Sequence, residues 1–334
     1  MTKKKFKKIF VLGSNSFAGS VFINKALNSN IHVVGISRSY EPKNIFLKYK
    51  SSCNLKNFKF FKYDLNNNIN QICDLLDEHK PNYIIDFAGQ GMVSPSWETP
   101  WEWYNTNLVS KTRLHRFLIG KKWLEKYIRI STPEVYGSVE NLIKPDTELN
   151  PSTPYAISHA AIDLNMTAFY KEFDFPMVLG RFANFYGPGQ QMYRIIPKTF
   201  FNFLTDKKLP LHGSGASVRS FLYSDDIADA IFALMYRGNV GKVYLFSSNE
   251  FITIKDLVKK ISMITGVSFE KNVYFTKDRI GKDMIYKMDS KRSITELNWK
   301  PKIKIDEGLI ECFKWAKENV NNIDGFLLDY IHKG

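Results

Sequence analysis

The sequence predicts an α/β fold built around a doubly wound parallel sheet, for three reasons. A short apolar segment at residues 9–12 leads into a glycine-containing turn and then into a helical pattern over residues 21–27. Strand-like segments follow at residues 32–37, 57–63 and 83–87, and helices are expected at about residues 100–119 and 154–173. Polar residues that suit acid/base chemistry come directly after a strand ending near residue 131. Open α/β sheets bind ligands at this end of their strands.

The composition is that of a globular protein with one large or two smaller domains, since 44% of the 334 residues are hydrophobic and 15% are aromatic. No apolar run approaches the ~18 residues of a membrane span. The lysine-rich start, MTKKKFKK, precedes only about four apolar residues, too few for a signal peptide. The three cysteines lie far apart without a Cys-x-x-Cys pair, which argues against disulfides or a zinc site. We therefore expect a cytoplasmic protein with no metal.

The net charge of +14 raises the question of nucleic-acid or membrane binding. Lysines are spread along the whole chain, with no arginine-rich block and no basic tail beyond the N-terminal MTKKKFKK. We therefore expect a solvated, lysine-rich surface and neither of those partners. A positive field would also favour a ligand that carries a diphosphate.

The turn after the first strand has the pattern of a dinucleotide-binding site. Gly13 and Gly19 bound it, and glycines let the backbone approach a pyrophosphate that rests on the helix N-terminus. The residues between them that we expect near the cofactor are Asn15, Ser16, Phe17 and Ala18.

The end of the second strand bears on the choice of cofactor. An NAD-selecting site would place an acidic residue there, but this chain has Ser37 and then Arg38. An uncharged residue followed by a guanidinium suits a 2′-phosphate, so we predict NADP, with NAD as the alternative. The other interpretation is that Arg38 is a loop cation without a ligand.

The segment from Ser131 to His159 is the candidate acid/base site. Thr132 and Glu134 follow a strand end, and Tyr155 and His159 lie four residues apart, on one face of the next helix. Taken singly, each has another explanation: strand-end hydroxyls often form turns or caps, the tyrosine would be a half-buried aromatic, and the histidine a solvated helix residue.

The order and spacing of these residues resemble the extended branch of the short-chain dehydrogenase/reductase superfamily, which modifies nucleotide sugars. In that branch a Ser/Thr-x-Glu-x-Tyr-Gly strand end precedes Tyr-x-x-x-Lys on a helix, and here TPEVYG at 132–137 precedes YAISH at 155–159. The segment RFANFYGPG at 181–189 resembles the family's Arg-x-x-Asn-x-Tyr-Gly-Pro signature. The resemblance extends from Gly13 to about Ala316. Ser16 replaces the family's middle glycine, and His159 replaces its lysine.

The resemblance implies a Rossmann-type NAD(P)-binding domain at residues 1–180, to which part of 220–250 returns, and a smaller C-terminal α/β substrate domain at 181–334. Further cofactor contacts are implied for Asp64, Leu65, Phe87, Ala88, Gly89, Gln90, Asn107, Tyr155 and His159. Contacts with a nucleotide-diphosphate sugar are implied for Met92, Val93, Ser94, Thr132, Asn184, Arg194, Arg219 and Arg279. Relatives are commonly dimers through the tyrosine-bearing helix and the one before it, and the apolar positions Ala160, Ala161, Leu164 and Phe169 permit a homodimer.

The activity implied by the resemblance is that of an NAD(P)-dependent nucleotide-sugar 4,6-dehydratase, acting in cell-surface polysaccharide synthesis. Tyr155 would remove the C4 hydroxyl proton, Thr132 would hydrogen-bond that hydroxyl, and Glu134 would act as the base at C5. Pro133 cannot supply the separate acid of one subgroup, so Glu134 would also protonate the C6 oxygen. The alternatives are a C4 or C2 epimerase on the same substrates and a paralogue that binds cofactor and nucleotide sugar without catalysis.

His159 is the departure from the family with the largest expected consequence. In the family the lysine donates to the nicotinamide ribose, and its charge lowers the pKa of the tyrosine. A histidine can donate one hydrogen bond, but with a reference pKa of ~6.5 it is mostly neutral near pH 7. The site would then work with an altered pH dependence, use another cation, or bind its ligands without turnover.

Overall fold

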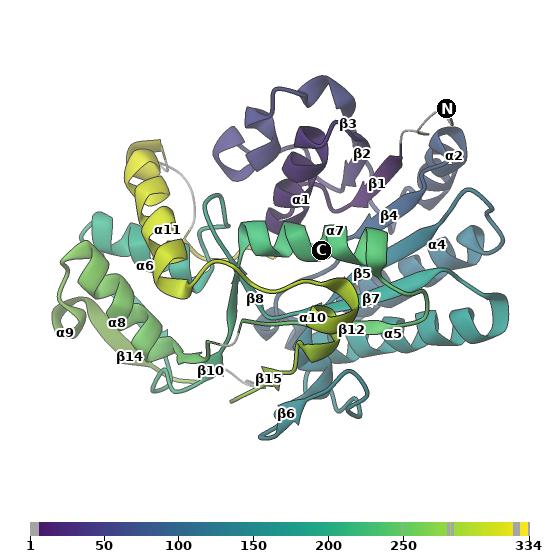
Figure 1. Cartoon of the computed structure of the whole chain (residues 1–334). Coiled ribbons are helices and arrows are strands. Elements are labelled where there is room, and N and C mark those ends of the chain that lie inside the picture. Colours follow the sequence, from purple (N-terminus) through teal and green to yellow (C-terminus); the bar gives the residue numbers. More distant parts are fainter. Residues whose placement is uncertain (1–6, 249, 279–280, 282–283, 323–327, 333–334) are drawn as a thin grey trace.

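The structure, a computed structural model, describes residues 7–248, 250–278, 281, 284–322 and 328–332. Its centre is a seven-stranded sheet in the order β12-β7-β5-β4-β1-β2-β3, with every neighbouring pair parallel (Figure 1). These strands are β1 (Lys8–Leu12), β2 (His32–Ser37), β3 (Phe58–Lys62), β4 (Tyr83–Asp86), β5 (Lys126–Ser131), β7 (Met177–Phe182) and β12 (Val243–Phe246). The strand order reverses between β1 and β4, which is where such sheets form a ligand crevice. The α/β fold predicted from the sequence is confirmed.

Helices cover both faces of the sheet because successive residues of each strand point to opposite faces. On β1, Ile9 and Val11 belong to one hydrophobic cluster, and Phe10 and Leu12 belong to another. The first cluster includes residues of α1 (Phe17–Asn28) and α7 (Ser224–Arg237), and the second includes residues of α2 (Ile69–His79), α4 (Ser110–Leu118) and α5 (Pro154–Phe173).

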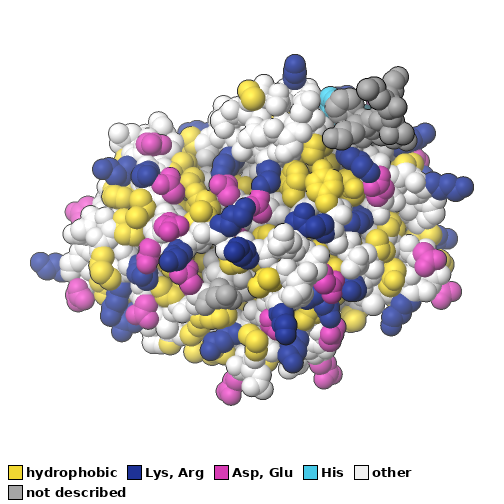
Figure 2. Space-filling view, in the orientation of Figure 1, with side chains coloured by type: hydrophobic (Ala, Val, Ile, Leu, Met, Phe, Trp, Pro, Cys, Tyr) yellow, Lys and Arg dark blue, Asp and Glu magenta, His cyan; other side chains and the backbone are white. Residues whose placement is uncertain are grey.

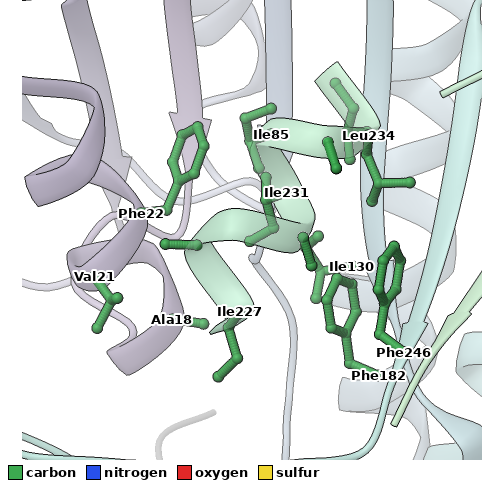
Figure 3. Close-up of a cluster of buried hydrophobic side chains, with 14 of the residues drawn as sticks. Ala18, Val21, Phe22, Ile85, Ile130, Phe182, Ile227, Ile231, Leu234 and Phe246 are labelled. Carbon is green, nitrogen blue, oxygen red and sulfur yellow. The ribbon is translucent and has the colours of Figure 1, made fainter. Parts of the chain in front are cut away.

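The first cluster holds α1, whose N-terminus borders the candidate site, against the sheet (Figure 3). Phe22 of α1 and Ile231 of α7 are fully buried there, together with Ile85 of β4. Burial of one such side chain contributes about 1.5–3 kcal/mol to folding. The position of the α1 N-terminus is therefore set by the core.

Several elements after β7 form a separate group with its own hydrophobic cluster, which includes Phe200, Phe201, Leu257 and Leu309. Its main helices and strands are α6 (Ile195–Leu204), β9 (Leu209–His212), α8 (Ile254–Thr265), β14 (Val273–Thr276) and α11 (Ile305–Asn319). Between these segments the chain returns to the main sheet through α7 and β12 (Figure 1). The smaller elements are β6 (Leu142–Ile143), β8 (Asn184–Tyr186), β10 (Val218–Arg219), β11 (Phe221–Tyr223), β13 (Ile252–Thr253), α9 (Phe269–Asn272), β15 (Lys287–Met288) and α10 (Lys291–Leu297).

Three boundaries differ from the sequence prediction. α1 begins at Phe17 rather than residue 21, because Ser16 caps it by accepting a hydrogen bond from the Gly19 main-chain N–H. The single helix expected over residues 100–119 consists of α3 (Pro100–Tyr104), a π-helical turn η5 (Asn105–Val109) and α4. β7 runs from Met177 to Phe182, so the predicted domain boundary at residue 180 falls inside a strand of the main sheet.

The positions predicted to permit a dimer lie on α5, and the prediction is wrong for one of them. Ala160 is only 4% exposed and belongs to the first cluster, because it lies on the face of α5 that packs on the protein core. Leu164, in contrast, is 59% exposed, and Ile157, one i,i+7 step before it, is 42% exposed. The homodimer itself stays a prediction.

The surface carries both signs of charge. Figure 2 shows Lys and Arg side chains scattered among Asp and Glu over one face of the molecule. No helix in the described part of the chain is both long and apolar enough to cross a membrane. Among the same residues, no group of three or more His, Cys, Asp or Glu side chains is arranged to hold a metal ion.

Candidate active site

A cavity of about 620 Å³ lies at the carboxyl ends of the sheet strands, and segments after β7 line its other side. It gathers predicted residues from the cofactor and substrate sets: Ser16, Phe17, Ala18, Arg38, Phe87, Ala88, Gly89, Gln90, Met92, Val93, Ser94, Thr132, Glu134, Tyr155, His159, Asn184, Arg194 and Arg219. The predicted residues that are described but do not line it are Gly13, Asn15, Gly19, Ser37, Asp64, Leu65 and Asn107. Arg279 lies outside the described residues.

The turn between β1 and α1 is shaped to receive an anion. Gly13 has φ +81°, and a Cβ at this position would lie 2.8 Å from the main-chain nitrogen of Ala88, so only glycine fits. Ser16, which replaces the family's middle glycine, serves as the N-cap of α1. The first turn of α1 contains no acidic residue, and Phe17 and Ala18 line the cavity. The partial positive charge of the helix N-terminus is therefore available to a pyrophosphate.

The end of β2 is tied to this turn and to the cavity. The Ser37 Oγ accepts a hydrogen bond from the Asn15 main-chain N–H at 3.0 Å, so the predicted cofactor residue Ser37 supports the turn. The Arg38 Nη2 donates to the Gln90 Oε1 at 3.4 Å, and both side chains line the cavity. The guanidinium of Arg38 is thus a cation at the cofactor end of the site.

Asn107 holds the loop after β4 from behind. Its Oδ1 accepts from the Gln90 main-chain N–H at 2.8 Å, and its Nδ2 donates to the Gln90 carbonyl at 3.2 Å and to the Ser158 Oγ at 3.0 Å. Asn107 is fully buried, so it fixes the loop and does not itself line the cavity.

Thr132, Glu134 and Tyr155 form a connected group at the end of β5. The Thr132 hydroxyl donates a hydrogen bond to the Glu134 carboxylate, and the Glu134 main-chain N–H donates to the Thr132 Oγ1 at 3.3 Å. Tyr155 enters from the first turn of α5, where Thr153 caps the helix and Pro154 follows it. A carboxylate, a hydroxyl and a phenol therefore share one wall of the cavity.

The ionisation of Tyr155 depends on opposing contributions. Burial raises the pKa of Tyr155 above its usual value, and the negative charge of Glu134 raises it further. A hydrogen bond with Thr132 and the positive charges of Arg194 and Arg129 lower the pKa of the phenol. Catalysis by a tyrosinate would depend on these cations.

His159 is buried, in contrast to the solvated residue that was one of the sequence interpretations. Its ring lies 4.6 Å from the ring of Tyr155, measured between centroids, and its Nδ1 lies 2.9 Å from the Nη2 of Arg129. Burial, together with the charges of Arg129 and Lys111, holds the pKa of His159 well below its usual value, and the nearby Gln90 main chain opposes this effect. The imidazole is therefore neutral at neutral pH.

Behind His159 lies a fully buried cluster of charged side chains that the sequence analysis did not identify. The Lys111 Nζ and the Arg129 Nη1 lie 2.7 Å and 3.1 Å from the Oδ2 of Asp86. The Arg129 Nε lies 3.6 Å from the Oδ1 of Asp163, whose Oδ2 pairs with the Arg181 Nη2 at 3.1 Å. A charged residue in the middle of an apolar strand, as Arg129 is in YIRIS, was the available sequence signal.

The substrate side of the cavity also includes residues that sequence analysis missed. Arg219 stacks on the ring of Tyr286 with its guanidinium carbon 4.4 Å from the centroid, and the Tyr286 hydroxyl donates to the Asn184 Oδ1 at 3.0 Å. Tyr193 and Tyr330 line the cavity and form an edge-to-face pair, although they lie far apart in sequence. Only the folded structure brings these aromatic residues together.

Known proteins resemble this chain in both sequence and structure. A model of the NAD dependent epimerase/dehydratase family matches residues 9–245. The human dTDP-D-glucose 4,6-dehydratase is 28% identical over 333 residues, covering 95% of this chain and 91% of the human protein. The structure of dTDP-glucose 4,6-dehydratase from Bacillus anthracis str. Ames in complex with NAD has a TM-score of 0.85 and 29% identity, covering 94% of this chain and 98% of that chain. The structure of UDP-glucuronic acid 4-epimerase from Bacillus cereus, in complex with UDP-glucuronic acid and NAD, has a TM-score of 0.83 and 26% identity. The match covers 93% of this chain and 99% of that chain.

Proposed function

Because the chain belongs to the NAD dependent epimerase/dehydratase family, we propose that it is a nucleotide-sugar 4,6-dehydratase that forms a 4-keto-6-deoxy product. The observation that carries this proposal is the carboxylate of Glu134, held by Thr132 beside Tyr155 in one cavity. A 4-epimerase needs a base only at the C4 hydroxyl, whereas elimination of water also needs a base at C5. The human and Bacillus anthracis relatives described above are both 4,6-dehydratases and match nearly the whole chain, at 28% and 29% identity, which also supports the proposal.

The residues around the cavity fit a nicotinamide dinucleotide. The turn after β1 and the N-terminus of α1 would hold the pyrophosphate, and His159 and Tyr155 would border the nicotinamide ribose. A bound nicotinamide would supply the hydride acceptor and donor that make the overall reaction redox-neutral.

The side chains supply the proton transfers. Tyr155 takes the C4 hydroxyl proton while Thr132 hydrogen-bonds the same oxygen. The resulting 4-keto group acidifies the C5 proton, which Glu134 removes. Pro133 has no acidic group, so Glu134 then delivers a proton to the C6 oxygen, which leaves as water. The proton taken from the C4 hydroxyl balances the proton that C5 regains when the hydride is returned to C6.

A labelled substrate tests the proposed reaction. The protein is incubated with dTDP- and UDP-linked hexoses that carry deuterium at C4, and the products are identified by mass spectrometry and NMR. We expect a 4-keto-6-deoxy sugar with deuterium at C6. A C4 epimer that keeps deuterium at C4 would instead identify an epimerase, and binding without product would identify a non-catalytic paralogue.

We also propose NADP as the preferred cofactor, on the basis of Ser37 and Arg38 at the end of β2. The two solved structures named above contain NAD, so the proposed preference for NADP rests on residues of this chain alone. Denaturing the purified protein should release NADP, identified by mass. Arg38→Ala should weaken NADP binding by about 10- to 100-fold, since hydrogen bonds to charged groups contribute about 1.5–3 kcal/mol, and should change NAD binding little. Release of NAD alone would overturn the preference and leave the reaction unchanged.

A further inference from the structure

We propose that Arg129 supplies, from behind His159, the positive charge that the family's lysine would bring to the catalytic tyrosine, and that His159 retains only the hydrogen-bond donor role of that lysine. Arg129 is in this proposal a positioning residue, because it acts on Tyr155 and the cofactor through His159. The inference rests on the proposed function, in which Tyr155 is the C4 base.

The hydrogen bond between these two residues fixes the tautomer of the imidazole. A guanidinium can only donate hydrogen bonds, so the Nδ1 of His159 must accept from the Arg129 Nη2, 2.9 Å away. The proton of the neutral ring is then on Nε2. This atom is buried and has no hydrogen-bond partner among the described residues, and His159 lines the cavity. The Gln90 main chain lies near the ring and favours its protonated form, but no hydrogen bond of normal geometry among the described residues occupies this N–H. The donor can therefore serve an oxygen of a bound ligand.

The charged cluster can supply a positive charge because its cations outnumber its carboxylates. Lys111, Arg129 and Arg181 are the cations, and Asp86 and Asp163 are the carboxylates. Burial and the charge of Arg129 lower the pKa of Lys111 to about 7, although Asp86 opposes this effect. One positive charge is therefore in excess while Lys111 is protonated, at and below about that pH. All five side chains are at most 5% exposed, so water screens this charge poorly.

Arg129 is the member of the cluster that connects it to the reaction. It contacts His159 and contributes to lowering the pKa of Tyr155. The other groups that bear on that phenol come from separate elements: Glu134 and Thr132 after β5, His159 on α5 and Arg194 before α6. Arg129 and Arg194 are the positive charges among them, and Arg194 lies on the substrate side of the cavity.

The same geometry explains why histidine rather than lysine stands at position 159. A lysine there would place an ammonium against the guanidinium of Arg129, which already shares Asp86 and Asp163 with Lys111 and Arg181. Histidine accepts from the guanidinium on one side and donates on the other. The two residues are therefore expected to be exchangeable only as a pair.

A double-substitution cycle tests this coupling. The variants are His159→Lys, Arg129→Gln and the two combined. Gln keeps an N–H donor for position 159 but removes the charge, and Asp86 and Asp163 still retain Lys111 and Arg181 as partners. The readouts are the unfolding temperature, the dissociation constant of the reduced cofactor from fluorescence, and the ionisation of Tyr155 from ultraviolet difference spectra against Tyr155→Phe in each background.

We expect His159→Lys alone to weaken cofactor binding by about tenfold or more and to lower the unfolding temperature, because two cations then meet. Arg129→Gln alone should raise the pKa of Tyr155 by about one unit, and the rising limb of the kcat profile should move to higher pH by the same amount. The double variant should recover cofactor binding and return the pKa toward that of the wild type, because one cation again stands beside the tyrosine.

Arg181→Gln is the matched control, because Arg181 belongs to the same cluster but donates to Tyr136 and Asp163 instead of His159. It should lower the unfolding temperature and move the pKa of Tyr155 much less than Arg129→Gln does, because Arg181 does not contact His159. The proposal is overturned if His159→Lys alone improves cofactor binding. It is also overturned if the double variant binds the cofactor no more tightly than the sum of the two single effects predicts. Cofactor binding and tyrosine ionisation do not depend on which sugar reacts, so failure here is distinct from failure of the labelled-substrate experiment.

Discussion

Glu134→Gln should abolish the elimination of water while sparing oxidation at C4. A positioned general acid/base typically contributes about 10²- to 10⁴-fold to a rate, so dehydration should slow by about that factor. Gln can still accept a hydrogen bond from Thr132, which keeps the side chain near its present position. The lower rate of dehydration would then reflect lost proton transfer at C5 and C6 and not a displaced loop.

The same substitution should make Tyr155 easier to ionise, because the charge of Glu134 raises the pKa of that phenol. C4 oxidation should therefore be unchanged or faster. In a single turnover with a nucleotide sugar, reduced nicotinamide should accumulate in absorbance and the 4-keto-6-deoxy product should be absent. Tyr155→Phe is the control, since it should prevent both the oxidation and the elimination. Continued elimination by Glu134→Gln would show that another group is the C5 base.

The sheet and its flanking helices could be predicted because their signals are local. Gly13 at a turn, an apolar strand before it and the spacing of Tyr155 and His159 are all visible within a few residues. The predicted strand at 32–37 agrees with β2 for this reason. The start of α1 was predicted too late because Ser16 was considered only as a replacement for glycine and not as a helix cap.

The charged cluster behind the site could not be predicted in the same way. Asp86, Lys111, Arg129, Asp163 and Arg181 come from β4, α4, β5, α5 and β7. A buried charge is tolerated only with partners, and these partners are distant in sequence. Arg129, in the apolar segment YIRIS, is the one member whose position indicates a buried charge. Its partners cannot be identified from the sequence, because only the parallel sheet brings them together.

Asp86→Asn should destabilise the protein by about 3–5 kcal/mol, the usual cost of removing one partner from a buried ion pair. The side chain of Asp86 is fully buried between Lys111 and Arg129, and it also accepts a hydrogen bond from the Tyr127 hydroxyl at 2.9 Å. Asn keeps the shape but removes the carboxylate that Lys111 and Arg129 share, which leaves Lys111 without an ion-pair partner among the described residues and Arg129 with Asp163 alone. Urea unfolding at pH 7, followed by far-ultraviolet circular dichroism, measures the loss of free energy of unfolding.

Acid should reduce the difference between wild type and Asp86→Asn. Burial alone would raise the pKa of Asp86, but the charges of Lys111 and Arg129 outweigh it and lower the pKa below the usual value. The stabilisation by Asp86 is therefore fully present above the unfolded pKa of ~3.9 and is lost as the pH falls through the lower folded value.

The double variant Asp86→Leu/Lys111→Met separates the value of the charges from the cost of leaving one unpaired. It should be more stable than Asp86→Asn, because it removes one of the two cations together with their carboxylate and fills the space with apolar atoms. A loss below about 1 kcal/mol for Asp86→Asn at pH 7 would contradict a buried, ionised Asp86. Such a result would also argue against the ionised Asp86 as the group that holds Arg129 in the orientation from which it reaches His159.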